Sequence, residues 1–220
     1  MRNVDDLELL AAAHHEAGHI VIAHSLNCRV DGLEVFWSDL GRWFGRSPMG
    51  LTKESLDGLQ VMMQMASLSV NGAKAAVAGM LAQTKFLATQ QDAEEVQFDA
   101  SSDLSEMVVF LRDNMRTEES QGCVVVSFLT GASKEKKRIE FNGLCFSTAD
   151  SKGFNYYLSH SGCSDPETLV RETMQMLDNE STWAKVKKLA SLVLSQPSTG
   201  EEKRRSLTAD QLLKALTAHG

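Results

Sequence analysis

The chain has 220 residues, of which 43% are hydrophobic and 23% are charged, so it can bury a core and is not disordered throughout. Its net charge of −7, without a long basic stripe, argues against a nucleic-acid partner. No run of about 18 apolar residues occurs, and acidic residues stand near the N-terminus where a signal peptide would be positive. Four cysteines form no C-x-x-C pair. We therefore expect a cytoplasmic protein with free thiols and no membrane segment.

The first predicted element is a helix over about residues 6–26. Asp5-x-x-Glu8 fits a capping box at its start, and apolar residues follow at helical spacing. Residues 29–37 then alternate as a strand does, and the glycine-dotted segment 41–50 indicates a turn and an irregular strand. The sequence thus predicts a small β-sheet near 29–51.

A long helix is predicted from Thr52, with its methionines as core filler. Asp92-x-x-Glu95 fits the cap of a short helix, and the pair Ser101-Ser102 fits the cap of the next one. These elements, together with the first helix, make the fold mainly α, of the α+β class.

Segment 118–160 differs in character from its surroundings and is predicted as a variable insert within a single domain spanning 1–220. A β-hairpin is expected near 121–147, and the Ser/Gly/Asn/Tyr-rich stretch 147–160 is expected to be loop. Its role as a lid, an oligomer contact or a disordered insert stays open.

The C-terminal part is predicted to be helical. Asp165-Pro166 is a good helix start, and the helical pattern runs to about Leu194 with a break near Asn179. Thr208-x-x-Gln211 fits the cap of a last helix.

The stretch His15-Glu16-Ala17-Gly18-His19 carries the strongest chemical signal, an H-E-x-x-H pattern. Two histidines four residues apart lie on one face of a helix, where both imidazoles can reach one Zn²⁺. Glu16 is placed to take a proton from a water beside that ion. Gly18 costs a helix roughly 1 kcal/mol relative to alanine, which suggests that another group approaches its backbone closely.

A catalytic zinc site needs a third protein ligand. No further histidine follows at a suitable short offset, so the ligand is expected to come from a distant part of the chain. His14 is interpreted as a residue behind the ligands or on the surface, and His24 as a surface residue. Periodicity leaves four candidates for the third ligand: Asp99, Asp103, Glu106 and His160.

The motif and three further stretches resemble the FtsH-type ATP-dependent zinc metalloproteases. His15–Val21 is similar to the HEAGHA-V motif of that family, and Asn71–Ala76 to its GGRAAEE stretch. Ala100–Leu104 resembles its GASNDL stretch, and Leu189–Asp210 its C-terminal helical section. Order and rough spacing match over about residues 7–117 and 165–218.

The resemblance implies His15, His19 and Asp103 as zinc ligands and Glu16 as the catalytic base. It also implies an edge strand within 33–51 that holds an extended protein or peptide substrate through its main chain. The 220 residues contain no Walker-type glycine motif, so we expect ATP-independent activity. A homo-oligomer and a separate ATPase partner stay open.

The leading hypothesis is therefore a zinc-dependent metalloendopeptidase. The first alternative is a non-catalytic, zinc-containing peptide-binding module, or an adaptor for a separate ATPase. The second alternative is a helical structural protein without metal, in which the H-E-x-x-H pattern is coincidence.

Overall fold

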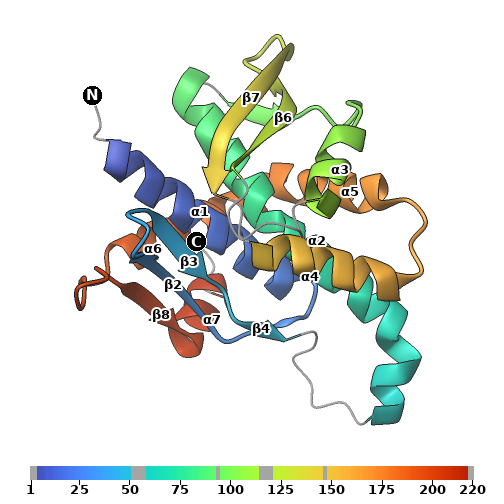
Figure 1. Cartoon of the computed structure of the whole chain (residues 1–220), viewed down its shortest axis with the longest axis horizontal. Coiled ribbons are helices and arrows are strands. Elements are labelled where there is room, and N and C mark those ends of the chain that lie inside the picture. The colour runs from blue at the N-terminus through green and yellow to red at the C-terminus, as the bar shows by residue number, and fades with distance from the viewer. Residues whose placement is uncertain (1–3, 51–57, 93–94, 114–120, 146–147, 218–220) are drawn as a thin grey trace.

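The computed structural model describes residues 4–50, 58–92, 95–113, 121–145 and 148–217. These residues form a mainly α, α+β fold, as expected (Figure 1). The helices are α1 (Val4–Ser25), α2 (Gly58–Asp92), α3 (Ser105–Asp113), α4 (Thr148–Ser161), α5 (Pro166–Asp178), α6 (Glu180–Leu194) and α7 (Ala209–Thr217). None of the described helices is long and apolar enough to cross a membrane.

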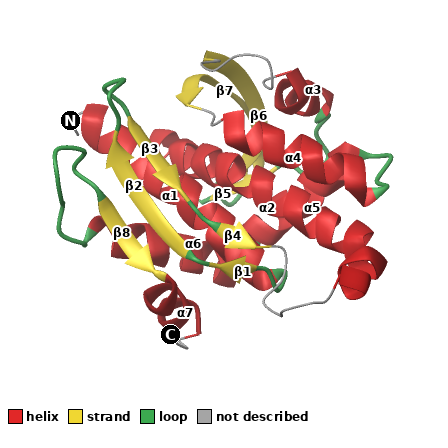
Figure 2. Ribbon diagram, turned by 60° about the horizontal axis from the view of Figure 1, so that its bottom comes forward, coloured by secondary structure: helices red, strands yellow, loops and turns green. Residues whose placement is uncertain are grey.

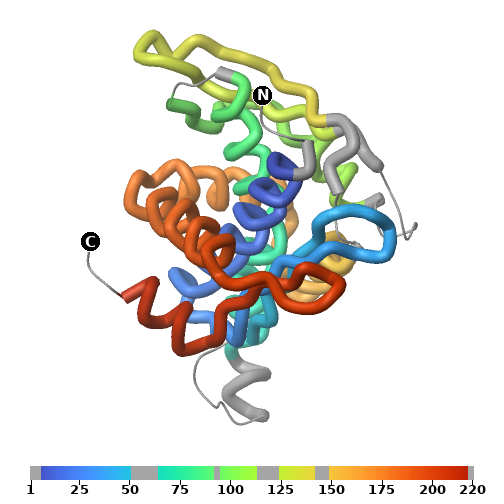
Figure 3. Tube along the Cα trace, turned by 90° about the vertical axis from the view of Figure 1, so that its left-hand side faces the viewer, coloured from blue at the N-terminus to red at the C-terminus, as the bar shows by residue number. Residues whose placement is uncertain are grey.

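The strands form three small antiparallel sheets (Figure 2). The first has the order β3-β2-β8, the second pairs β1 with β4, and the third has the order β5-β6-β7. Their bounds are β1 (Arg29–Val30), β2 (Gly32–Trp37), β3 (Trp43–Arg46), β4 (Met49–Gly50), β5 (Val96–Phe98), β6 (Gln121–Thr130), β7 (Glu135–Cys145) and β8 (Arg205–Thr208). The β6–β7 hairpin and α7 lie at opposite ends of the molecule (Figure 3).

Helix α1 is the central element of the core, and every residue from Ala11 to Ala23 is buried. It packs against α2 and α6. A Cβ on Gly18 would lie 2.5 Å from the Cβ of Ala82 and 2.7 Å from the carbonyl oxygen of Ala78. Helix α2 therefore approaches Gly18 so closely that only glycine fits, which confirms the close approach inferred from the sequence.

Local sequence signals predict several element ends correctly. Asp165 caps α5 by accepting hydrogen bonds from the amides of Glu167 and Thr168, and Asn179 separates α5 from α6. At α7 the Thr208 amide donates to Gln211 Oε1 over 2.8 Å, and the Gln211 amide donates to Thr208 Oγ1 over 3.4 Å. The predicted strands over 29–50 and the predicted hairpin are also present.

Other local predictions are wrong. Helix α1 begins at or before Val4, so it includes Asp5, the predicted capping position, as a helical residue. Strand β5 follows α2 where the sequence predicts a short helix from Asp92, although residues 93–94 lie outside the described residues. The predicted start of α2 at Thr52 also lies outside them, within 51–57.

The largest error concerns residues 147–160, which are predicted as loop but form helix α4 from Thr148. Its polar, glycine-containing sequence has weak helix propensity. Packing supplies the missing stability: Phe154 is fully buried, α4 lies along α2, and the Asn155 amide donates to the carbonyl of Leu111 in α3 over 2.9 Å. Tertiary contacts thus override the local preference.

Candidate metal centre

Two imidazoles of α1 face each other in the interior. His15 is 6% exposed and His19 is 3% exposed, and their Nε2 atoms lie 3.0 Å apart. The spacing of four residues on one helix places both rings on the same face, as the sequence predicts.

Helix α2 determines which nitrogen of each ring carries the proton. His15 Nδ1 lies 3.0 Å from the side-chain oxygen of Gln83, and His19 Nδ1 lies 2.7 Å from the carbonyl oxygen of Ala75. Both oxygens are acceptors, so each Nδ1–H donates to its oxygen. In the neutral form of each ring, Nε2 then presents a lone pair to the space between the rings, the arrangement expected of metal-binding histidines.

Asp150 supplies a third donor from the first turn of α4. Its Oδ2 lies 3.0 Å from His15 Nε2, and its Oδ1 lies 3.4 Å from His19 Nε2. An ion bonded to tetrahedral ligands at about 2.0–2.1 Å separates those ligands by about 3.3 Å. The three groups are therefore close enough for one metal ion to reach a donor atom of each, and two imidazoles with one carboxylate suit zinc.

Gly79 of α2 lies against both Nε2 atoms. A Cβ at this position would lie 2.2 Å from His19 Nε2 and 2.6 Å from His15 Nε2. Any side chain here would enter the space between the two Nε2 atoms and α2. The missing side chain of Gly79 thus keeps that space open, and the residues present fit a small metal ion.

The electrostatics of the ion-free cluster indicate a place for positive charge. Burial by itself would lower the pKa of His19, but the carboxylate of Asp150 raises it to about 9. Burial likewise opposes ionisation of Asp150, yet the two histidines hold the pKa of its carboxyl well below the usual range. A carboxylate facing two imidazoles binds a cation, whether a proton or a metal ion.

Glu16 lies beside the donors, next to His15 on α1. It is 6% exposed, and burial raises the pKa of its carboxyl above the ordinary value. The Ser47 hydroxyl donates a hydrogen bond to its Oε2. A Cβ on Gly45 would lie 2.2 Å from Glu16 Cγ, so β3 passes directly over this side chain.

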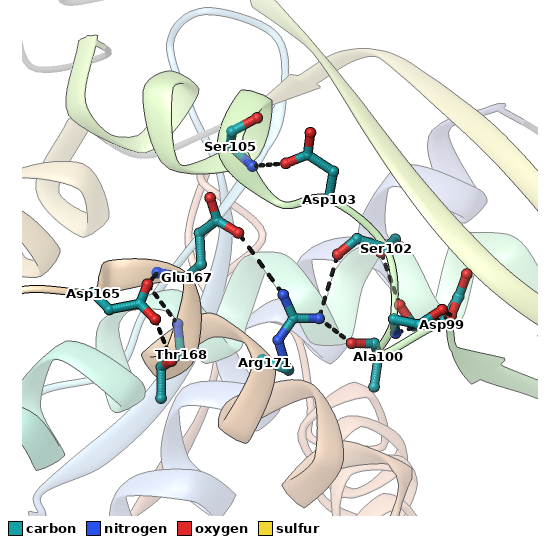
Figure 4. A network of polar contacts seen from close by, with 10 residues as sticks. Asp99, Ala100, Ser102, Asp103, Ser105, Asp165, Glu167, Thr168 and Arg171 are labelled. Carbon is teal, nitrogen blue, oxygen red and sulfur yellow. Dashed lines mark hydrogen bonds and ion pairs between the residues drawn. The ribbon is translucent and has the colours of Figure 1, made fainter.

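Asp103, the predicted third ligand, does not join this cluster. It is exposed, and its carboxylate accepts a hydrogen bond from the Ser105 amide over 2.9 Å (Figure 4). Nearby, Arg171 holds the same loop by donating to the carbonyl oxygens of Ala100 and Ser102. Asp103 thus belongs to the start of α3, and Asp150 stands where the third donor is needed.

The other three candidates for the third ligand also make contacts elsewhere. The buried carboxylate of Asp99 pairs with Lys136 over 2.6 Å, Glu106 pairs with Arg138 at the surface, and His160 is exposed next to Tyr156.

The two remaining histidines of α1 are not part of the donor cluster. His14, interpreted from the sequence as a residue behind the ligands or on the surface, is buried and stacks on Phe86 at 3.9 Å between ring centroids. Burial lowers the pKa of His14 to about 4. His24 is half-buried near the end of the helix.

A pocket of about 520 Å³ opens beside the cluster. Its polar lining comes from Glu16, His19, Arg46, Ser47 and Asp150, and most of the remaining lining residues are small or apolar. Residues 45–50, the end of β3 and the segment through β4, form one side. Among the described residues, β3 is one of the two outer strands of its sheet, so an edge strand within the predicted range 33–51 lies next to the donors.

Comparison of the chain with known protein families, with curated proteins and with solved structures finds no match.

Proposed function

We propose that this chain is a zinc-dependent metalloendopeptidase that hydrolyses peptide bonds of protein substrates. The observation that carries the proposal is the convergence of three donors, from His15, His19 and Asp150, next to the buried carboxylate of Glu16. The resemblance of His15–Val21 to the FtsH-type metalloproteases supports the same activity.

The three donors would hold the ion, and Gln83 and Ala75 would keep the imidazoles oriented. When bound, zinc polarises the carbonyl of the scissile bond and lowers the pKa of an adjacent water toward about 7.

Glu16 is the proposed general base. Its buried carboxylate lies beside the three donors, and the Ser47 hydroxyl donates to its Oε2, so the carboxylate is placed to accept a proton from a water next to the ion. It accepts a proton from the attacking water and passes that proton to the nitrogen of the leaving amine. The same carboxyl therefore serves first as base and then as acid.

The substrate is proposed to bind as an extended strand along β3. Main-chain hydrogen bonds to an outer strand accept many sequences, because they do not depend on side chains. The apolar part of the neighbouring pocket then receives one side chain of the substrate. Free thiols at Cys28 and Cys163 are compatible with the proposed cytoplasmic location.

The test measures zinc per chain by elemental analysis and the cleavage of an unfolded protein such as casein, for the parent and for Glu16→Gln. We expect about one zinc in both proteins and a loss of cleavage of roughly 10²–10⁴-fold in the variant. Equal cleavage by both would refute the role of Glu16. Bound zinc without cleavage by the parent would favour the binding module, and a zinc-free parent after reconstitution would favour a structural protein.

A further inference from the structure

The residue that holds the Glu16 carboxylate comes from outside the H-E-x-x-H motif. Ser47 Oγ donates to Glu16 Oε2 and also lies 3.2 Å from the Glu16 carbonyl oxygen. A hydroxyl has one proton, and an ionised carboxylate attracts it more strongly than a carbonyl does. The hydrogen bond to Oε2 is therefore the dominant one.

The position of Ser47 is fixed on both sides by paired strands. Before it, β3 pairs with β2 through Arg46 and Glu34, and after it, β4 pairs with β1 through Met49 and Val30. The Asp31 amide also donates to the carbonyl oxygen of Pro48 over 2.9 Å. The short connection between β3 and β4 thus presents the hydroxyl from a rigid frame.

Gly45 and Ser47 together confine the Glu16 side chain. The backbone at Gly45 lies so close that a Cβ would come within 2.6 Å of Glu16 Oε1, while Ser47 binds Oε2. A buried carboxylate without such a partner would be costly and free to turn. Strand β3, the proposed substrate edge, and the connection that follows it therefore also set the orientation of the proposed base.

We propose that Ser47 is a positioning residue, which orients the Glu16 carboxylate by binding Oε2 and leaves Oε1 to accept the proton. The inference rests on the proposed peptidase function for its catalytic consequence. The contact between Ser47 and Glu16 can be tested without activity.

The first experiment is a double-mutant cycle on the zinc-free protein, followed by thermal unfolding. Ser47→Ala should lower the melting temperature by roughly 3–8 °C in the parent, because a hydrogen bond to a buried carboxylate is lost. The Glu16→Met variant lacks the acceptor, so in that background Ser47→Ala should lower the melting temperature much less. Equal shifts in both backgrounds would overturn the proposed contact.

The second experiment measures casein cleavage by the zinc-loaded protein. Ser47→Ala should keep its zinc and its KM and lose kcat by about 10–100-fold, because the base is no longer held in place. Ser47→Thr retains a hydroxyl, so its kcat should be within about threefold of the kcat of the parent. Ser38→Ala is the matched control, because that hydroxyl binds the Arg42 carbonyl in the β2–β3 turn.

An unchanged or higher kcat in Ser47→Ala would overturn the positioning role. If the parent itself shows no zinc-dependent cleavage, the proposed function fails and the catalytic consequence fails with it. In that case the cycle on the zinc-free protein still decides whether Ser47 orients Glu16.

Discussion

The two sides of the donor cluster are built in different ways. On the α1 side, His15 and His19 come from one helix face and are oriented by atoms of α2. On the α4 side, a single carboxylate arrives from residue 150, and its helix depends on packing against α2 and α3. The positions of the two histidines therefore follow from local helix geometry. The position of Asp150 depends on tertiary packing.

The largest effect is expected on the α4 side. Asp150→Ala should weaken zinc binding by more than roughly 100-fold, because it removes a proposed direct ligand rather than a residue behind one. Asp103→Ala is the matched control and should retain zinc, because its carboxylate accepts a hydrogen bond at the start of α3 and is not part of the donor cluster found among the described residues. Elemental analysis and zinc titration of the two variants measure how much zinc each one retains and how tightly it binds. Loss of zinc in Asp103→Ala alone would restore the assignment made from the sequence.

A second comparison uses two glycines, one on α2 and one on α4. Gly79→Ala should destabilise the zinc-free protein by about 1–3 kcal/mol and weaken zinc binding, because its Cβ would meet both imidazoles. Gly153→Ala should be neutral or stabilising by up to about 1 kcal/mol, since its Cβ would meet Ala76 Cβ at an ordinary 3.7 Å.

Urea unfolding and zinc titration of the two glycine variants provide the measurement. If Gly79→Ala bound zinc like the parent, the donors would have to lie farther from α2 than described.

The smallest effect concerns the ion pair that ties the β6–β7 hairpin to the loop before α3. Hydrogen bonds from Lys136 and Ser101 hold the pKa of Asp99 below its usual value of 3.8. Since the folded state binds this proton less readily than the unfolded state, the pair contributes stability above pH 3.8. That contribution is lost as the pH falls below 3.8, through the lowered pKa.

Asp99→Asn should therefore reduce stability at pH 6 by less than about 1 kcal/mol, because Lys136 is exposed. Urea unfolding should show that the difference in unfolding free energy between variant and parent becomes smaller toward pH 3. A difference that grows as the pH falls would contradict the assigned direction.

Much of the α1 side could be predicted from the sequence, because its signals are local. The spacing of His15 and His19 requires only a helix, and the need for space at Gly18 follows from its cost in a helix. The contacts of Ser47 and Gly79 with the site could not be predicted in this way. They depend on how β3 and α2 pack over α1.

The choice between Asp103 and Asp150 shows the limit most clearly. Both follow short runs of small and hydroxyl residues, Ala100-Ser101-Ser102 and Ser147-Thr148-Ala149, so composition does not distinguish them. The stretch around Asp150 has weak helix propensity and is therefore predicted as loop. Burial of Phe154 against the rest of the fold creates the helix, and only then does Asp150 face the histidines.

His15 and Asp150 stand 135 positions apart along the chain. An ion held by both would act as a removable crosslink, closing a loop that contains more than half of the protein. Such a link stabilises the folded chain by mass action, because the unfolded chain has no assembled site to bind the ion. The availability of zinc would then contribute to how firmly α1 and α4 are held together, and so to the stability of the fold.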